Sequence, residues 1–307
     1  GAETTKITID GANNTLTIEE GGSVKPSSGF AVEFQANSSL KTFENKGTLL
    51  GASEAIKFKG TTIDNFINSG TIDSQNWSGL EINNGTNYIK TFNNTGTINS
   101  NKNNAIFLYQ GGIDEFINEK DGLIKGNDHG IKIDHSTIKT FNNEGIISNN
   151  NDTSLKIDSS AIETLNNSGT IKSDGVNEPS DSSSIIGSTG IKIYLTHAKN
   201  FNNTGVVAGK VGVSLGGSTI DSFTNSGTIE SMSNHKYGAA IAVSNLNGIV
   251  STIKNFTNSG TIKADNASGI LIEAGNTIEN LTNSGTIEAS LYGIGFFTVD
   301  KYGNEIN

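Results

Sequence analysis

The ten residues from Ile89 to Ile98 read Ile-Lys-Thr-Phe-Asn-Asn-Thr-Gly-Thr-Ile, and this stretch decides the fold. Similar stretches recur along the chain, and their glycines are mostly 22 to 26 residues apart, with two longer intervals of 36 and 33. A period of this size is typical of solenoid proteins, whose repeats bury a shared core by stacking. The other copies begin at Leu40, Ile63, Ile113, Ile138, Ile162, Ala198, Ile220, Ile253 and Ile278.

The motif favours strand over helix because it is rich in β-branched and aromatic residues. Every second residue of a strand faces the same way, so Phe92, Asn94, Gly96 and Ile98 are expected to point inward. A second short strand of the form Gly-Ile-Lys-Ile precedes the motif, and the odd Ile-x-x-Phe spacing predicts a corner. We therefore predict an all-β fold, a right-handed parallel β-helix of about 11 coils with three short strands each.

One outward position alternates in charge through all ten copies, which a linear chain does not explain. In a stacked helix each of these charges would lie next to two opposite charges, so we interpret the column as a device that sets register. The column consists of Lys41, Asp64, Lys90, Asp114, Lys139, Glu163, Lys199, Asp221, Lys254 and Glu279.

Two inward columns are expected to fill the core of the helix. The phenylalanines should stack on one another, with Leu165 and Leu281 taking their place in two copies. The motif asparagines, such as Asn94, should form a ladder in which each amide bonds to its neighbours. The glycine two residues later, such as Gly96, predicts a tight bend or a crowded interior.

The chain divides into residues 1–39, predicted to be an N-terminal cap or first coil, and residues 40–307, which contain the β-helix repeats. Its last strand would leave an open edge, so we expect the C-terminal end to be truncated. Two copies carry insertions, at 173–190 and within 231–252, which are either binding loops or neutral additions.

Composition excludes several classes of function. The net charge is -10, there is no Arg among the 21 basic residues, and there is no Cys. Such a chain is unsuited to nucleic acid, and it offers no disulfide or thiolate metal site. No apolar run is long enough for a membrane helix. The four histidines occupy unequal positions in the repeat, so we predict no metal site, no cofactor and no catalytic residue.

The outward face of the Gly-Ile-Lys-Ile strand is the candidate binding surface. Aromatic residues next to stacked lysines form an amphipathic strip on an otherwise polar, acidic chain. The alternative is that these aromatics only fit the pleat of a solvent-facing strand. The strip consists of Phe107, Tyr109, Lys132, Asp134, Lys156, Asp158, Lys192 and Tyr194.

An enzyme is the alternative that the same strip leaves open. Asp134 and Asp158 would lie one coil apart, at about the 5 Å separation that retaining glycosidases use. However, Lys132 and Lys156 stand beside them and would hold both carboxylates ionised. The sequence therefore favours a contact surface over a polysaccharide-degrading site.

The repeated Phe-Asn-Asn-Ser/Thr-Gly-Thr-Ile motif, the lysine-only basic set and the missing Cys resemble autotransporter passenger domains. The likeness is to the Asn-rich adhesins and vacuolating-toxin-like proteins of epsilon-proteobacteria, and it spans residues 40–290. The resemblance implies a virulence-associated β-helix at the bacterial cell surface, exposed on the outer membrane or secreted, and attached in full length to a C-terminal outer-membrane β-barrel.

We therefore expect a non-enzymatic adhesin. Its partners would be a host-cell surface protein or glycan, or the same protein on another cell. The alternatives are a secreted polysaccharide-degrading β-helix enzyme and a toxin-like passenger that oligomerises on membranes.

Overall fold

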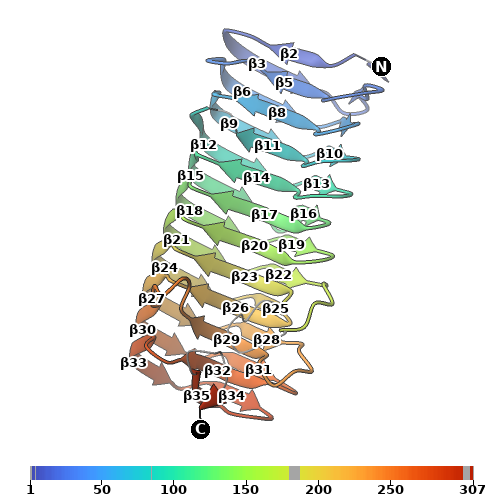
Figure 1. The fold of residues 1–307 in the computed structure, drawn as a ribbon. Helices are drawn as coiled ribbons and strands as arrows, with labels where there is room; N and C mark the ends of the chain where they lie inside the picture. The colour runs from blue at the N-terminus through green and yellow to red at the C-terminus, as the bar shows by residue number, and fades with distance from the viewer. Residues whose placement is uncertain (1, 4, 84, 180–186, 300–304, 307) are drawn as a thin grey trace. The chain divides into compact units, whose positions relative to one another are not determined.

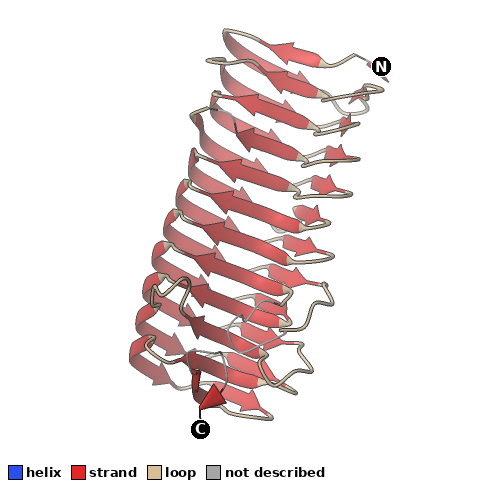
Figure 2. Cartoon of the chain, viewed as in Figure 1, coloured by secondary structure: helices blue, strands red, loops and turns tan. Residues whose placement is uncertain are grey.

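The computed structural model describes residues 2–3, 5–83, 85–179, 187–299 and 305–306. The chain folds as an all-β parallel β-solenoid of about 11 coils with three parallel sheets, which confirms the predicted fold class. Within the described ranges the structure contains strands and loops but no helix (Figure 2). The chain separates into two compact units, Gly1–Ile147 and Ser148–Asn307, to which we refer as unit 1 and unit 2.

Each coil of unit 1 gives one strand to each of three sheets, A, B and C (Figure 1). Sheet A contains β1 (Ala2–Glu3), β4 (Ser23–Val24), β7 (Thr48–Gly51), β10 (Thr71–Ser74), β13 (Thr97–Ser100) and β16 (Leu123–Gly126). Sheet B contains β2 (Ile7–Ile9), β5 (Val32–Phe34), β8 (Ile56–Lys59), β11 (Leu80–Asn83), β14 (Ile106–Tyr109) and β17 (His129–Asp134). Sheet C contains β3 (Ala12–Ile18), β6 (Ser39–Asn45), β9 (Thr62–Asn68), β12 (Asn87–Asn94), β15 (Gly111–Asn118) and β18 (Thr137–Asn143).

Unit 2 repeats the same arrangement, and β19 (Ile146–Asn149) contains the point where the two units divide. Sheet A has β22 (Thr170–Ser173), β25 (Val206–Gly209), β28 (Thr228–Ser231), β31 (Thr261–Ala264) and β34 (Thr286–Ala289). Sheet B has β20 (Thr153–Asp158), β23 (Thr189–Tyr194), β26 (Val211–Gly216), β29 (Ala239–Ser244), β32 (Ser268–Glu273) and β35 (Ile294–Val299), and β36 (Glu305–Ile306) pairs antiparallel with β35. Sheet C has β21 (Ala161–Asn167), β24 (His197–Asn203), β27 (Thr219–Asn225), β30 (Thr252–Asn258) and β33 (Thr277–Asn283).

Residues 2–39 contribute strands to all three sheets of unit 1. Strand β3 pairs in parallel with β6, β5 pairs with β8, and β4 pairs with β7. Ile18 of β3 is the register partner of Asn45, so the first coil carries an aliphatic residue where the motif has its asparagine. The predicted boundary between residues 39 and 40 stays a prediction.

The predicted phenylalanine column forms the centre of the core. In unit 1 the rings from Phe43 to Phe141 stack coil upon coil, with centroids 4.6 to 4.8 Å apart. In unit 2 Phe201 stacks on Phe223 at 4.3 Å, while Phe223 meets Phe256 edge-on. These rings are almost completely buried, so a chain that is one-third hydrophobic still builds a dry core.

The asparagine ladder is also confirmed. In unit 1 the Nδ2 of Asn68 donates to Asn94 Oδ1 at 2.7 Å, and Asn94 Nδ2 donates to Asn118 Oδ1 at 2.8 Å. Most of the amides also donate to the carbonyl of their own motif glycine, as Asn94 does to Gly96 at 3.1 Å, whereas Asn45 donates to the Thr71 carbonyl at 3.2 Å. In unit 2 Asn203 donates to Asn225 at 2.8 Å. Interior amides such as Asn94 are thereby satisfied as both donor and acceptor, whereas the Oδ1 of Asn45, the first amide of the ladder, is buried without a hydrogen-bond partner.

The structure bears out one of the two predicted bends of the motif and modifies the other. For the motif glycine the sequence predicts a tight bend or a crowded interior, and both are found, because β12 ends at Asn94 and β13 begins at Thr97. A Cβ on Gly96 would lie 2.2 Å from the carbonyl oxygen of Gly70, so the chain turns here and a side chain is sterically excluded. At the Ile-x-x-Phe step, where a corner is predicted, the strand continues. Ile89 pairs with Ile63 and Thr91 pairs with Asn65, so the ladder skips the residue between them.

The residue skipped at that corner belongs to the alternating charge column. Within unit 1 the Lys139 Nζ lies 2.7 Å from the Asp114 carboxylate. Within unit 2 Lys199 lies 3.3 Å from Glu163, and Lys254 lies 2.7 Å from Asp221. These three contacts confirm, at those coils, the predicted pairing of opposite charges between neighbours.

A second polar ladder, which the sequence interpretation missed, lies at the corner between sheets B and C. In unit 2 the backbone N–H of Thr196 donates to Ser218 Oγ at 3.2 Å, and that of Ser218 donates to Ser251 Oγ at 3.1 Å. The Thr196 hydroxyl in turn donates to the Tyr194 carbonyl at 2.7 Å. The signal was a hydroxyl residue two positions before the first aliphatic residue of most motifs.

Candidate functional site

The part of the predicted strip in unit 1 is assembled as expected. Phe107 and Lys132 are register partners on β14 and β17, and Tyr109 and Asp134 are the next pair. The Lys132 Nζ lies 5.1 Å from the centroid of the Phe107 ring, and the Phe107 and Tyr109 centroids are 6.1 Å apart. All four side chains are half-buried. We name these four residues the aromatic strip.

The part of the predicted strip in unit 2 is only partly a surface. Lys156 and Lys192 are register partners, as are Asp158 and Tyr194. The expectation that Lys192 is exposed was wrong, because it is 4% exposed and pairs with Asp152 at 3.4 Å. Burial also raises the pKa of Tyr194.

The physical reason is that the outward face of sheet B is covered from β23 to β32 of unit 2, whereas Lys156 and Asp158 on β20 are half-buried. Ser214 and Ala242, at the outward position of the next two coils, are fully buried. Outward-facing Ala242 and Leu271 belong to an apolar cluster that also includes Phe297. The alternation of a strand predicts which way a side chain points, but it does not predict what covers it.

Asp134 and Asp158, the carboxylates considered for catalysis, belong to different units. Asp134 Oδ1 lies 2.6 Å from the Nδ1 of His135, and Asp158 accepts a 3.0 Å hydrogen bond from the Ser159 hydroxyl. Each carboxylate therefore has a polar partner in the turn that follows its own strand.

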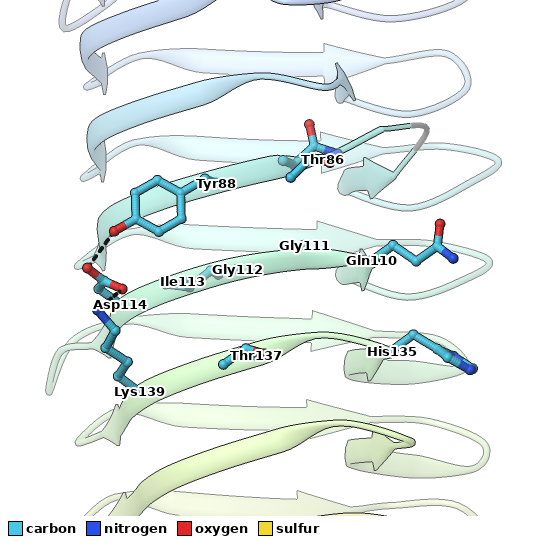
Figure 3. A pocket seen from close by; sticks show the side chains of 11 residues that line it. Thr86, Tyr88, Gln110, Gly111, Gly112, Ile113, Asp114, His135, Thr137 and Lys139 are labelled. Atoms are coloured by element: carbon cyan, nitrogen blue, oxygen red, sulfur yellow. Dashed lines mark hydrogen bonds and ion pairs between the residues drawn. The ribbon is translucent and has the colours of Figure 1, made fainter.

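A pocket of about 510 Å³ opens on sheet C of unit 1, beside the aromatic strip. Figure 3 shows Tyr88, Asp114 and Lys139 at one end of it, and Gln110 and His135 at the other. The His135 ring makes an edge contact with Tyr109 at 5.8 Å, which connects the pocket to the strip. The lining residues are Thr86, Asn87, Tyr88, Gln110, Gly111, Gly112, Ile113, Asp114, His135, Thr137 and Lys139.

A hydrogen-bonded triad fixes one end of the pocket. The Tyr88 hydroxyl donates to Asp114 Oδ2, and the other carboxylate oxygen pairs with Lys139 at 2.7 Å. The hydrogen bonds from Lys139 and Tyr88 lower the pKa of Asp114, and the carboxylate raises the pKa of Tyr88. The acid is therefore held ionised, and the phenol is held protonated in a fixed orientation.

The sequence interpretation missed this pocket. The sequence signal of the pocket is a change at the position before the first aliphatic residue of the motif. Two coils of unit 1 carry threonine there, Thr62 and Thr137. Tyr88 and Gly112 replace that threonine in two successive coils. A bulky residue next to a residue without a side chain creates a wall and a hollow.

The two predicted insertions contact each other in unit 2. Residues 180–186 lie outside the described residues, but Glu178 of the first insertion pairs with Lys210 at 2.7 Å. Glu178 also accepts a 2.6 Å hydrogen bond from Ser233 of the second insertion. Burial opposes ionisation of Glu178, yet these bonds outweigh it and lower its pKa. Whether either loop binds a partner stays a prediction.

Comparison with known proteins found no matching protein family, no matching curated protein and no matching solved structure. Among the residues that the structure describes, none belongs to a helix long and apolar enough to cross a membrane.

Proposed function

We propose that this protein is a non-enzymatic bacterial surface adhesin, a β-helical passenger domain of the autotransporter type. It would be exposed at the outer membrane or secreted, and it would attach to host cells, to glycans or to other bacteria. The fold is compatible with such a passenger, because a stacked solenoid presents a flat, repetitive surface on which a few non-repeat residues mark the contact area.

The observation that carries the proposal is the aromatic strip. Phe107 and Tyr109 stand at positions where neighbouring coils of sheet B have Glu81 and Asp134. The two rings are half-buried and lie next to each other, with the Lys132 ammonium over one of them. Rigid aromatic side chains with a polar rim are typical of protein and glycan contact surfaces.

Binding of the labelled, purified chain to epithelial cells and to bacterial cells tests the proposal. The double variant is Phe107→Ser and Tyr109→Asn. Other coils carry serine and asparagine at these positions of sheet B, as Ser214 and Asn83, so the variant should keep the sheet intact. We expect it to lose most cell binding, while Tyr292→Ser, which removes an exposed aromatic residue in unit 2, should bind as before.

One result would remove the aromatic strip from the adhesin proposal, and two others would overturn the proposal. Equal cell binding by the double variant would show that the aromatic strip is not the contact surface. Degradation of a polysaccharide that is lost in Asp134→Ala would point to an enzyme. Leakage of liposomes on addition of the chain would point to a toxin-like passenger.

A further inference from the structure

We propose that the pocket on sheet C of unit 1 binds one pyranose ring of a neutral glycan. This inference rests on the proposed adhesive function and names the ligand class of one site. It is carried by the shape of the pocket, by the orientation of Tyr88 and by the pairing of every charged group that lines it.

The hollow exists because one coil lacks an outward side chain that its neighbours carry. Gly112 pairs with Tyr88 on one side and with Thr137 on the other, so a gap of one side chain opens between them. The neighbouring Gly111 does not widen this gap, because a Cβ on it would lie 2.7 Å from Cδ1 of the buried Leu108. The resulting volume of about 510 Å³ falls within the roughly 300–1,000 Å³ that is usual for small-ligand sites.

The wall of the hollow is an aromatic ring held in one orientation. A Cβ on Gly112 would lie 3.4 Å from Tyr88 Cδ2, so the ring borders the missing side chain directly. The hydrogen bond to Asp114 fixes the hydroxyl end of the ring. An oriented tyrosine offers an apolar face at little cost in conformational entropy, which suits the C–H face of a sugar ring.

The polar groups around the hollow match hydroxyls better than they match a charged ligand. Thr86, Gln110 and Thr137 supply neutral donors and acceptors. Asp114 is already paired with Lys139 at 2.7 Å, and His135 lies 2.6 Å from Asp134. An anionic sugar would have to compete with Asp114 for Lys139, so the lining favours a neutral pyranose.

Unit 2 contains a related triad that has histidine in place of tyrosine and threonine in place of the glycine. His197 stands at the position of Tyr88 and lies 3.0 Å from Asp221, which pairs with Lys254 at 2.7 Å. Thr219 is the register partner of His197, so a side chain stands where unit 1 has Gly112. The glycine is therefore the feature that distinguishes the pocket from an ordinary part of the charge column.

The experiment uses the purified chain on an array of neutral glycans containing glucose, galactose, mannose, fucose or N-acetylglucosamine, with sialylated and sulfated glycans alongside. Calorimetry then measures the affinity for the glycan that is bound best. We expect a neutral glycan to be preferred, and Gly112→Thr to weaken binding at least tenfold. Tyr88→Thr should have a similar effect, whereas Thr219→Ala in unit 2 should bind like the original chain.

The Gly112→Thr variant should fold, because threonine is the residue of the next coil and the added Cβ makes only ordinary contacts. An unchanged melting temperature would verify this. Failure to bind any neutral glycan, preference for acidic glycans, or unchanged affinity in Gly112→Thr would overturn the inference. If Gly112→Thr keeps both cell adhesion and glycan binding, the adhesin proposal stands and the pocket is not the glycan site. If the original chain binds a neutral glycan but adheres to no cell, the glycan site stands and the adhesin proposal is wrong.

Discussion

Truncation of one interior amide of the asparagine ladder, Asn94→Ala, is expected to destabilise unit 1 by about 4–5 kcal/mol. Asn94 is fully buried, and it receives a 2.7 Å hydrogen bond from Asn68 and donates one of 2.8 Å to Asn118. It also donates to the Gly96 carbonyl at 3.1 Å. Three net hydrogen bonds contribute roughly 1 kcal/mol each, and leaving Asn118 Oδ1 without its donor costs about 1–2 kcal/mol more.

Urea unfolding followed by circular dichroism measures this change, and Thr95→Ala is the matched control. Thr95 is exposed on the same coil, and its hydroxyl makes only a 3.4 Å contact with the Asn68 carbonyl, so its loss should cost less than about 0.5 kcal/mol. If Asn94→Ala destabilises no more than Thr95→Ala, the ladder does not hold the coils together and the reasoning is refuted.

The charge state of the ladder gives an independent test in Asn94→Asp. A buried carboxylate would face the oxygens of Asn118 and Gly96, which accept hydrogen bonds and cannot donate them. Its pKa would be raised in the folded state, so the variant should lose stability as pH rises through that pKa and regain part of it in acid. A pH-independent loss would contradict the assigned donor and acceptor roles.

Three further predictions concern the core, the bend and a buried acid. Phe141→Ala should cost about 3–5 kcal/mol in urea unfolding, whereas Lys139→Glu should cost a few tenths, because the first residue is fully buried and the second is an exposed ion-pair partner. Gly96→Ala should prevent or severely impair folding, because its Cβ would lie 2.2 Å from the Gly70 carbonyl oxygen. The control Gly293→Ala should leave the melting temperature unchanged, since the nearest atom to its Cβ would be Ile287 Cγ2 at 3.9 Å. Burial raises the pKa of Glu81 in the folded state, although Lys57 lies 3.6 Å away. The contribution of Glu81 to the free energy of unfolding is therefore present in acid and is lost as pH rises through the raised pKa. Glu81→Gln should therefore raise the melting temperature at neutral pH. It should have little effect below about pH 4, where the carboxyl is protonated in the folded and the unfolded state. A lower melting temperature at neutral pH would instead show that the pairing with Lys57 outweighs the cost of burying the carboxylate.

The fold was predictable because each repeat position has one physical task. Phe92 supplies a ring to the core, Asn94 supplies an amide to the ladder, and Gly96 allows a crowded bend. The period of the repeat is enough to place each of them next to the residue at the same position of the neighbouring coil. Two-residue alternation continues through the bend at Thr95–Gly96 without a change in its pattern, so only the recurring glycine predicts that bend.

The candidate site was predictable only in part. Alternation placed Phe107 and Tyr109 on the outward face correctly, but it also placed Lys192 in solvent, where the outward face of sheet B is in fact covered. The pocket depends on a departure from the repeat, Gly112 in place of threonine, whereas periodicity predicts only the positions that recur. Tyr88 and Gly112 are both exceptions to the period, and these exceptions are the sequence signal of the pocket.

The asparagine ladder has a consequence for how proteins of this kind change in length. The Nδ2–Oδ1 distance is 2.8 Å between Asn167 and Asn203, which are 36 residues apart, and 2.8 Å between Asn203 and Asn225, which are 22 apart. An insertion of more than a dozen residues therefore leaves the contact between adjacent coils unchanged. Since the rungs within each unit have Nδ2–Oδ1 distances of 2.7 to 2.8 Å, a gene of this type can gain or lose whole coils by recombination between its own repeats, and can acquire loops between them, without the remaining coils having to change in sequence.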